Sequence, residues 1–252
     1  MGRIGTSERN SWIVEDGHID LCRGRPGERA ARFATMDESV TVDLASSALV
    51  VVDMQKDFCA PDGMAGTGGR DVDSTRPLVE RLQQLVPALR ASGVPIIWVN
   101  WGNRPDRANL PPGVIRIFDR EGTGAGIGAP NPVTGHHQLE AGSPSADLAD
   151  GLEALDDDIR IDKYRIDGFV DTALDSVLRV HGITTVFFAG VNVDQCVLFT
   201  LGHAAQLGYD VVLLDDCSGT TSPDFCSEAT LYNVRRCLGF VATSTDVMAG
   251  LG

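Results

Sequence analysis

Residues 183–197, ITTVFFAGVNVDQCV, decide the fold of this chain. The run 184–189 is continuously apolar, β-branched and aromatic, which is typical of a central strand buried on both faces. This run stops at Gly190, and the apolar segment beyond it ends at Gly208, a residue type that commonly ends helices. We therefore predict a buried strand followed by a helix that begins near Asp194.

Cys196 falls in the first turn of this predicted helix. Free backbone N–H groups and the positive end of the helix dipole favour a thiolate over a thiol at such a position. The same N–H groups can hold a developing oxyanion. Cys196 is therefore the candidate nucleophile, although a lone cysteine is more often a small packed side chain.

Strand and helix patterns alternate along the rest of the chain. This alternation predicts a three-layer αβα fold, with a doubly wound, mostly parallel sheet and helices on both faces. We expect strands at 47–54, 94–101, 158–162, 209–216 and 239–244. We expect helices from Ser74 or Thr75 to Gly93, over 146–155, over 171–180, and from Ser222 or Asp224 to Leu238.

Asp53 and Lys163 stand at the ends of two predicted strands, and Cys196 follows a third. Ligands of such sheets bind beyond the carboxyl ends of the strands, so the three side chains are expected at one edge. A thiolate there can attack an amide or ureide carbonyl, while Asp53 moves the proton and Lys163 balances charge. Taken singly, the aspartate fits a local cap and the lysine a solvated surface position.

Three motifs together resemble the isochorismatase-like cysteine hydrolase superfamily. They are GVNVDQCV at 190–197, VVVDMQKDF at 50–58 and IDKYRIDGFVDTALDSVL at 161–178. The resemblance spans roughly Ala48 to Val247, and it implies the catalytic set Asp53, Lys163 and Cys196. It is closest to biuret hydrolases and ureidoacrylate amidohydrolases.

The same resemblance implies a cis peptide bond between Val191 and Asn192, with the N–H groups of Asn192 and Cys196 forming an oxyanion hole. Metal-binding members carry an Asp-x-His element after the second strand, whereas residues 100–103 read NWGN here. We therefore expect a site without metal or cofactor. The resemblance also implies a homodimer or homotetramer.

Aromatic and polar residues near the predicted strand ends are candidates for binding a small-molecule substrate. The aromatic ones fit the core equally well, and Arg104 fits the surface equally well. The candidates are Phe58, Trp101, Asn103, Arg104, Tyr164, Phe169, Tyr232 and Asn233.

Composition narrows the class of partner. The 252 residues include 21 Lys+Arg against 35 Asp+Glu, a net charge of −14, which disfavours nucleic acid and anionic membranes. Neither a membrane-spanning run nor a signal peptide is evident, so a cytoplasmic protein is expected. The six cysteines include no CxxC pair, and only His136 and His137 are adjacent histidines, so reduced thiols and no structural zinc are expected.

Residues 1–42 lack sustained periodicity and are expected to form an amino-terminal arm with at most short structure; residues 43–252 then form one hydrolase domain. Residues 105–145 are rich in Gly and Pro. Their glycines neither follow a strand nor open a helix, so nucleotide binding is disfavoured and a lid is expected.

The sequence thus favours a cysteine-dependent C–N hydrolase that acts on a small linear amide or ureide through a covalent intermediate. An N-carbamoyl amino acid or a nicotinamide-like amide stays open as substrate. Two other classes are also retained: a noncatalytic binding protein on the same fold, and a redox-sensing thiol, for which no resolving cysteine is evident.

Overall fold

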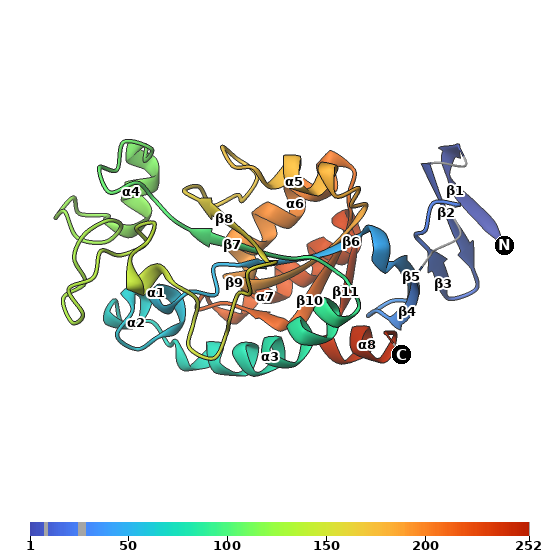
Figure 1. The fold of residues 1–252 in the computed structure, drawn as a ribbon, viewed down its shortest axis with the longest axis horizontal. Helices are drawn as coiled ribbons and strands as arrows, with labels where there is room; N and C mark the ends of the chain where they lie inside the picture. Colours follow the sequence, from blue (N-terminus) through green and yellow to red (C-terminus); the bar gives the residue numbers. More distant parts are fainter. Residues whose placement is uncertain (8–9, 25–28, 252) are drawn as a thin grey trace.

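The computed structural model describes residues 1–7, 10–24 and 29–251. Its centre is a parallel six-stranded sheet in the order β11-β10-β9-β6-β7-β8 (Figure 1). This order confirms the predicted doubly wound sheet. The strands are β6 (Ser47–Val52), β7 (Ile96–Trp101), β8 (Ile159–Lys163), β9 (Thr185–Val191), β10 (Asp210–Gly219) and β11 (Phe240–Ala242).

Helices cover both faces of this sheet, which gives the expected three layers. Helices α3 (Arg76–Ala91) and α8 (Ser244–Ala249) lie on one face, and α5 (Leu174–Val180) and α6 (Leu198–Leu207) lie on the other (Figure 1). Strand β6 shows why. Its alternate side chains point to opposite faces of the sheet. Leu49 and Val51 pack in the apolar core between the sheet and α3. Ala48, Val50 and Val52 pack in the apolar core between the sheet and α6.

The segment from β9 to α6 follows the sequence prediction. Every residue of β9 is buried. A π-helical turn, η4 (Val193–Val197), comes next and continues directly into α6. Gly208 ends α6 with a φ of 94°, in the left-handed region that favours glycine.

Short helices and a long loop cover the carboxyl ends of the strands (Figure 1). The helices are α1 (Lys56–Cys59), α2 (Met64–Thr67) and α4 (Pro112–Phe118), together with the 3₁₀ turn η3 (Pro144–Ala146). A small apolar cluster fixes the loop here by packing Leu110, Val114, Ile127 and Leu139 against Trp101. The segment therefore lies where a lid is expected.

The prediction of a helix over 146–155 is wrong. Beyond η3 the chain forms an isolated bridge and then a turn at 150–151 instead, because Leu148 bridges Gln55 and the Ala149 N–H donates to the Met54 carbonyl oxygen at 2.8 Å. The last long helix also differs from a simple α-helix. It consists of α7 (Asp224–Asn233) followed by a π-helical turn, η5 (Val234–Leu238).

The amino-terminal segment holds more structure than expected. It forms a five-stranded sheet in the order β1-β2-β3-β5-β4, and Phe33, Val40 and Val42 from this sheet join the core next to α3. Strands of three to six residues alternate too briefly for their period to stand out in the sequence. They are β1 (Gly2–Ser7), β2 (Asn10–Glu15), β3 (His18–Asp20), β4 (Ala30–Ala34) and β5 (Ser39–Asp43).

A buried ion pair links this amino-terminal sheet to the main sheet. Arg23 Nη2 lies 2.7 Å from Asp210 Oδ1, and their side chains are 18% and 3% exposed. Burial raises the pKa of Asp210 to about 6, although Arg23 opposes the shift. The Asp210 charge therefore costs stability above about pH 6, and Arg23 offsets that cost.

We expect Arg23→Met to lower the free energy of unfolding by about 3 kcal/mol at neutral pH, because it leaves a buried carboxylate unpaired. The loss should shrink as the pH falls through the pKa of Asp210. Urea denaturation at several pH values measures both effects. Arg235→Met is the matched control, since it removes an exposed pair with Asp37 and should cost much less. Equal losses in the two variants would contradict the assignment.

No helix in the described part of the chain is long and apolar enough to cross a membrane.

Candidate active site

Asp53, Lys163 and Cys196 converge at the carboxyl edge of the sheet. Asp53 directly follows β6, Lys163 ends β8, and Cys196 lies in η4 after β9. All three are buried, with exposed fractions of 0%, 0% and 6%. They meet because the carboxyl ends of parallel strands lie at one edge. Asp53 takes a φ of 53° as the chain leaves the strand.

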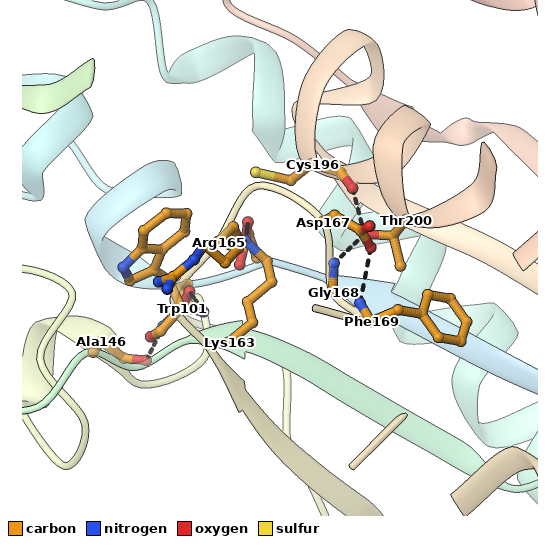
Figure 2. A network of polar contacts seen from close by, with 11 residues as sticks. Trp101, Ala146, Lys163, Arg165, Asp167, Gly168, Phe169, Cys196 and Thr200 are labelled. Carbon is orange, nitrogen blue, oxygen red and sulfur yellow. Dashed lines mark hydrogen bonds and ion pairs between the residues drawn. The ribbon is translucent and has the colours of Figure 1, made fainter. Parts of the chain in front are cut away.

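The ammonium of Lys163 is held by three groups. Its Nζ lies 2.8 Å from Asp53 Oδ2 and donates to the Arg165 carbonyl oxygen at 3.1 Å. The same atom lies 4.2 Å from the ring centre of Trp101, a cation–π distance. Figure 2 shows Cys196, Lys163 and Trp101 directed toward one region from three separate elements.

Burial and pairing act against each other on the two charged groups. Burial opposes the charge on Lys163, but the Asp53 carboxylate and Cys196 outweigh it, so the pKa of Lys163 is raised. Burial also raises the pKa of Asp53, with Lys163 opposing. An aspartate with a raised pKa is a stronger base than an exposed one, and the ammonium beside it favours its ionised form.

Cys196 differs from the expectation of a resting thiolate. Burial raises the pKa of its thiol to about 12; the Lys163 ammonium opposes this shift, while the Asp53 carboxylate adds to it. Burial thus disfavours the charged form of a thiol that stands at the start of a helix. The Asp53 carboxyl group interacts with this thiol, so a base lies within reach of the thiol proton.

We expect no thiolate at Cys196 in the free protein up to about pH 9, because its pKa lies near 12. The measurement is the ultraviolet thiolate absorbance of wild type minus that of Cys196→Ser across a pH titration. The subtraction removes the other five thiols. A step of one thiolate near neutral pH would show that the helix start ionises the cysteine unaided.

The peptide bond between Val191 and Asn192 is cis, at the position that the resemblance implies. Asn192 precedes η4. Its carbonyl oxygen accepts hydrogen bonds from the Gln195 and Val197 N–H groups, and its side-chain oxygen accepts one from the Thr221 N–H at 3.2 Å. An oxyanion hole made by the N–H groups of Asn192 and Cys196 stays a prediction.

Five of the substrate-binding candidates lie near the carboxyl edge. Trp101 is buried below Lys163 Nζ, and Asn103 is buried with its amide donating to the Arg104 carbonyl oxygen at 3.0 Å. Phe58 and Tyr164 are partly buried against the apolar cluster of Trp101 and the covering loop. Phe169 is buried, with its ring centre 5.0 Å from that of His203.

The structure does not bring the other three candidates into this buried group. Arg104 is exposed and forms a bidentate pair with Asp106. Tyr232 and Asn233 lie on α7 with exposed side chains. A role for these residues in substrate binding stays a prediction.

Two polar residues that support the site were missed in the sequence. Gln55 is fully buried: its Nε2 donates to the Trp101 and Ala146 carbonyl oxygens, and its Oε1 accepts from the Trp101 N–H. Asp57 accepts from the Leu139 and Met64 N–H groups. Through these hydrogen bonds, both side chains hold the short helices and the loop that cover the site against the carboxyl ends of the strands. The available signal was three polar residues, 55–57, directly after a buried strand.

Across the described ranges, no group of three His, Cys, Asp or Glu side chains is arranged to hold a metal ion. A site that works without metal stays a prediction.

Comparison with known proteins agrees with this geometry. The isochorismatase domain family matches residues 47–246. A cysteine hydrolase from Pseudomonas syringae pv. phaseolicola 1448A is 25% identical, with a TM-score of 0.70 over 83% of this chain and 94% of the other. An isochorismatase family protein from Desulfovibrio vulgaris subsp. vulgaris str. Hildenborough is 26% identical, with a TM-score of 0.65 over 79% and 95%.

N-carbamoylsarcosine amidase from Thermoplasma acidophilum shares the fold at 24% identity, with a TM-score of 0.60 over 79% of this chain and 96% of the other. The parallel sheet with its buried Asp, Lys and Cys group thus has the architecture of a hydrolase. The chain belongs to the isochorismatase family, as the three sequence motifs predicted.

Proposed function

We propose that this protein is a cysteine-dependent amidohydrolase that cleaves a small linear amide or ureide. The observation that carries the proposal is the buried ion pair of Lys163 Nζ and Asp53 Oδ2 at 2.8 Å, beside the buried thiol of Cys196. A buried thiol with a raised pKa needs a base within reach, and Asp53 interacts with it directly. A purely structural cysteine needs neither charge.

In the first half of the proposed reaction, Cys196 Sγ attacks the carbonyl carbon of the substrate while its proton passes to Asp53. The carbonyl oxygen becomes an oxyanion, which the N–H groups of Asn192 and Cys196 would stabilise. Asp53 then returns the proton to the leaving nitrogen, and the C–N bond breaks. Ammonia or an amine departs, and the acyl or carbamoyl group stays on the sulfur.

In the second half, Asp53 takes a proton from a water molecule that attacks the thioester carbonyl. The C–S bond breaks, the proton returns to sulfur, and the carboxylic or carbamic acid leaves. Lys163 remains an ammonium throughout. It keeps Asp53 ionised between the two steps, because its charge lowers the pKa of that carboxyl group against the effect of burial.

The test is ammonia release by the purified protein from biuret, ureidoacrylate, N-carbamoyl amino acids, nicotinamide and simple amides, with and without a chelator. We expect chelator-insensitive turnover of a ureide. Turnover of nicotinamide alone would replace the substrate class, and turnover abolished by the chelator would overturn the metal-free mechanism. Saturable binding of these compounds without any product would favour the noncatalytic binding protein.

A further inference from the structure

One face of the cysteine helix carries polar side chains that reach away from the thiol. Cys196, Thr200 and His203 follow one another at spacings of four and three residues, so they lie along one stripe of η4 and α6. Figure 2 shows Thr200 between Cys196 and the loop that follows β8. The stripe therefore connects the helix of Cys196 to the loop that follows Lys163.

Thr200 makes two hydrogen bonds through one hydroxyl group. Its Oγ1 donates to the Cys196 carbonyl oxygen at 2.6 Å and accepts from the Gly168 N–H at 2.9 Å. The Thr200 side chain is fully buried, so water does not compete for either bond. The hydroxyl group thus joins the backbone of the nucleophile directly to the backbone of the loop.

A second contact lies one turn further along α6. His203 Nδ1 is 2.5 Å from Asp167 Oδ2, and Asp167 Oδ1 accepts from the Phe169 N–H at 2.8 Å. The Phe169 ring packs on the His203 ring. Residues 167–169 are therefore held against α6 at two separate points.

The loop held in this way is the one that positions Lys163. The Arg165 carbonyl oxygen accepts the hydrogen bond from Lys163 Nζ, and Gly168 lies three residues further along. Gly168 also fits its place closely: a methyl group there would lie about 3 Å from Thr200 Cγ2 and from Val99 Cγ1. The spacing between the loop and the cysteine helix is thus set by direct contact.

We propose that Thr200 is a positioning residue, which sets the distance and angle between the Cys196 thiol and the Asp53 and Lys163 pair. The role rests on the proposed hydrolase function. The physical reason is that the thiol follows β9, whereas the ammonium that pairs with Asp53 belongs to Lys163 at the end of β8. The separation between the thiol and this ion pair therefore depends on how η4 docks against the loop after β8. A misplacement of about 1 Å can cost about 100-fold in rate.

The chain offers a matched control. Thr230 on α7 is also buried, and its Oγ1 donates to the Cys226 carbonyl oxygen at 2.8 Å, the same bond to the residue four positions earlier. It contacts no part of the loop after β8 in the described hydrogen bonds. Thr230→Val therefore removes the helical bond alone, whereas Thr200→Val also removes the bond to the loop.

The experiment compares Thr200→Val, Thr200→Ser and Thr230→Val in steady-state kinetics and in the rate of Cys196 alkylation by iodoacetamide, followed by peptide mass spectrometry. We expect Thr200→Val to lower kcat and the alkylation rate at least about 10-fold with KM within about 3-fold. Thr200→Ser retains the hydroxyl and should stay within about 3-fold of wild type, and so should Thr230→Val.

Gly168→Ala tests the same contact from the other side, since its methyl group presses on Thr200 without removing the hydroxyl. It should also slow both reactions, and it serves if Thr200→Val does not fold. Equal rates for Thr200→Val and Thr230→Val would overturn the proposal. If wild type turns over no substrate, the hydrolase function fails separately. Alkylation still decides the positioning role, which stands only if Thr200→Val reacts more slowly than Thr230→Val.

Discussion

Cys196→Ala should abolish hydrolysis of the substrate, with a loss of at least about 10⁴-fold in kcat, because no other group can form the covalent intermediate. The buried thiol lies beside the only charged pair assigned to the chemistry, and alanine leaves Asp53 and Lys163 in place. Ammonia release under saturating substrate measures the loss. The fold should be retained, since the substitution removes one sulfur atom from a site at the edge of the core.

The control for this variant is Cys237→Ala, which removes an exposed thiol and should leave turnover unchanged. Acid quenching of wild type during turnover should also show a mass increase on the peptide that carries Cys196, and no such increase in Cys196→Ala. Residual turnover above about one hundredth of wild type would mean that water, activated by Asp53, attacks the substrate directly.

Lys163→Met should cost both activity and stability. Removing one partner of a buried ion pair leaves the Asp53 carboxylate uncompensated, which costs about 3–5 kcal/mol. Lys163 lowers the pKa of Asp53 against the effect of burial, so without it this carboxyl group should protonate at higher pH. The acid limb of the pH–rate profile should therefore move to higher pH, and kcat/KM at neutral pH should fall at least about 10³-fold.

Urea denaturation and pH–rate profiles measure these two effects. Lys56→Met is the control, because Lys56 pairs with the exposed Asp150 at 3.3 Å and its loss should change little. The double variant Lys163→Met with Asp53→Asn should regain stability without regaining activity, since both charges are then gone. A Lys163→Met protein as stable as wild type would show that Asp53 is already neutral in the resting site.

Much of the sheet was readable from the sequence. Strand β9 is buried at every position, so its whole run is apolar or β-branched, and Gly208 marks the end of α6 for a steric reason. The proximity of three side chains was readable for the same reason. Once parallel strands are predicted, residues at their carboxyl ends have to meet, and Asp53, Lys163 and Cys196 all stand there.

Other features were decided only by contacts between distant segments. The amino-terminal strands were missed because each is short, and because β4 and β5 are held by the core beside α3, which local pattern does not show. Residues 146–155 carry a helical pattern, yet the free backbone groups at the end of β6 pair with Leu148 and Ala149 instead. Tertiary hydrogen bonds outweighed local propensity there.

The sequence by itself determined which residues lie on the strands of the main sheet, because burial on one or two faces dictates the period of apolar residues along the chain. Only the tertiary structure decided the chemical state of the site. Burial in the folded chain raises the pKa of the Cys196 thiol, and Thr200 reaches Gly168 because α6 packs against the loop after β8. Burial and proximity of this kind depend on residues more than 30 positions apart, so no local pattern records them.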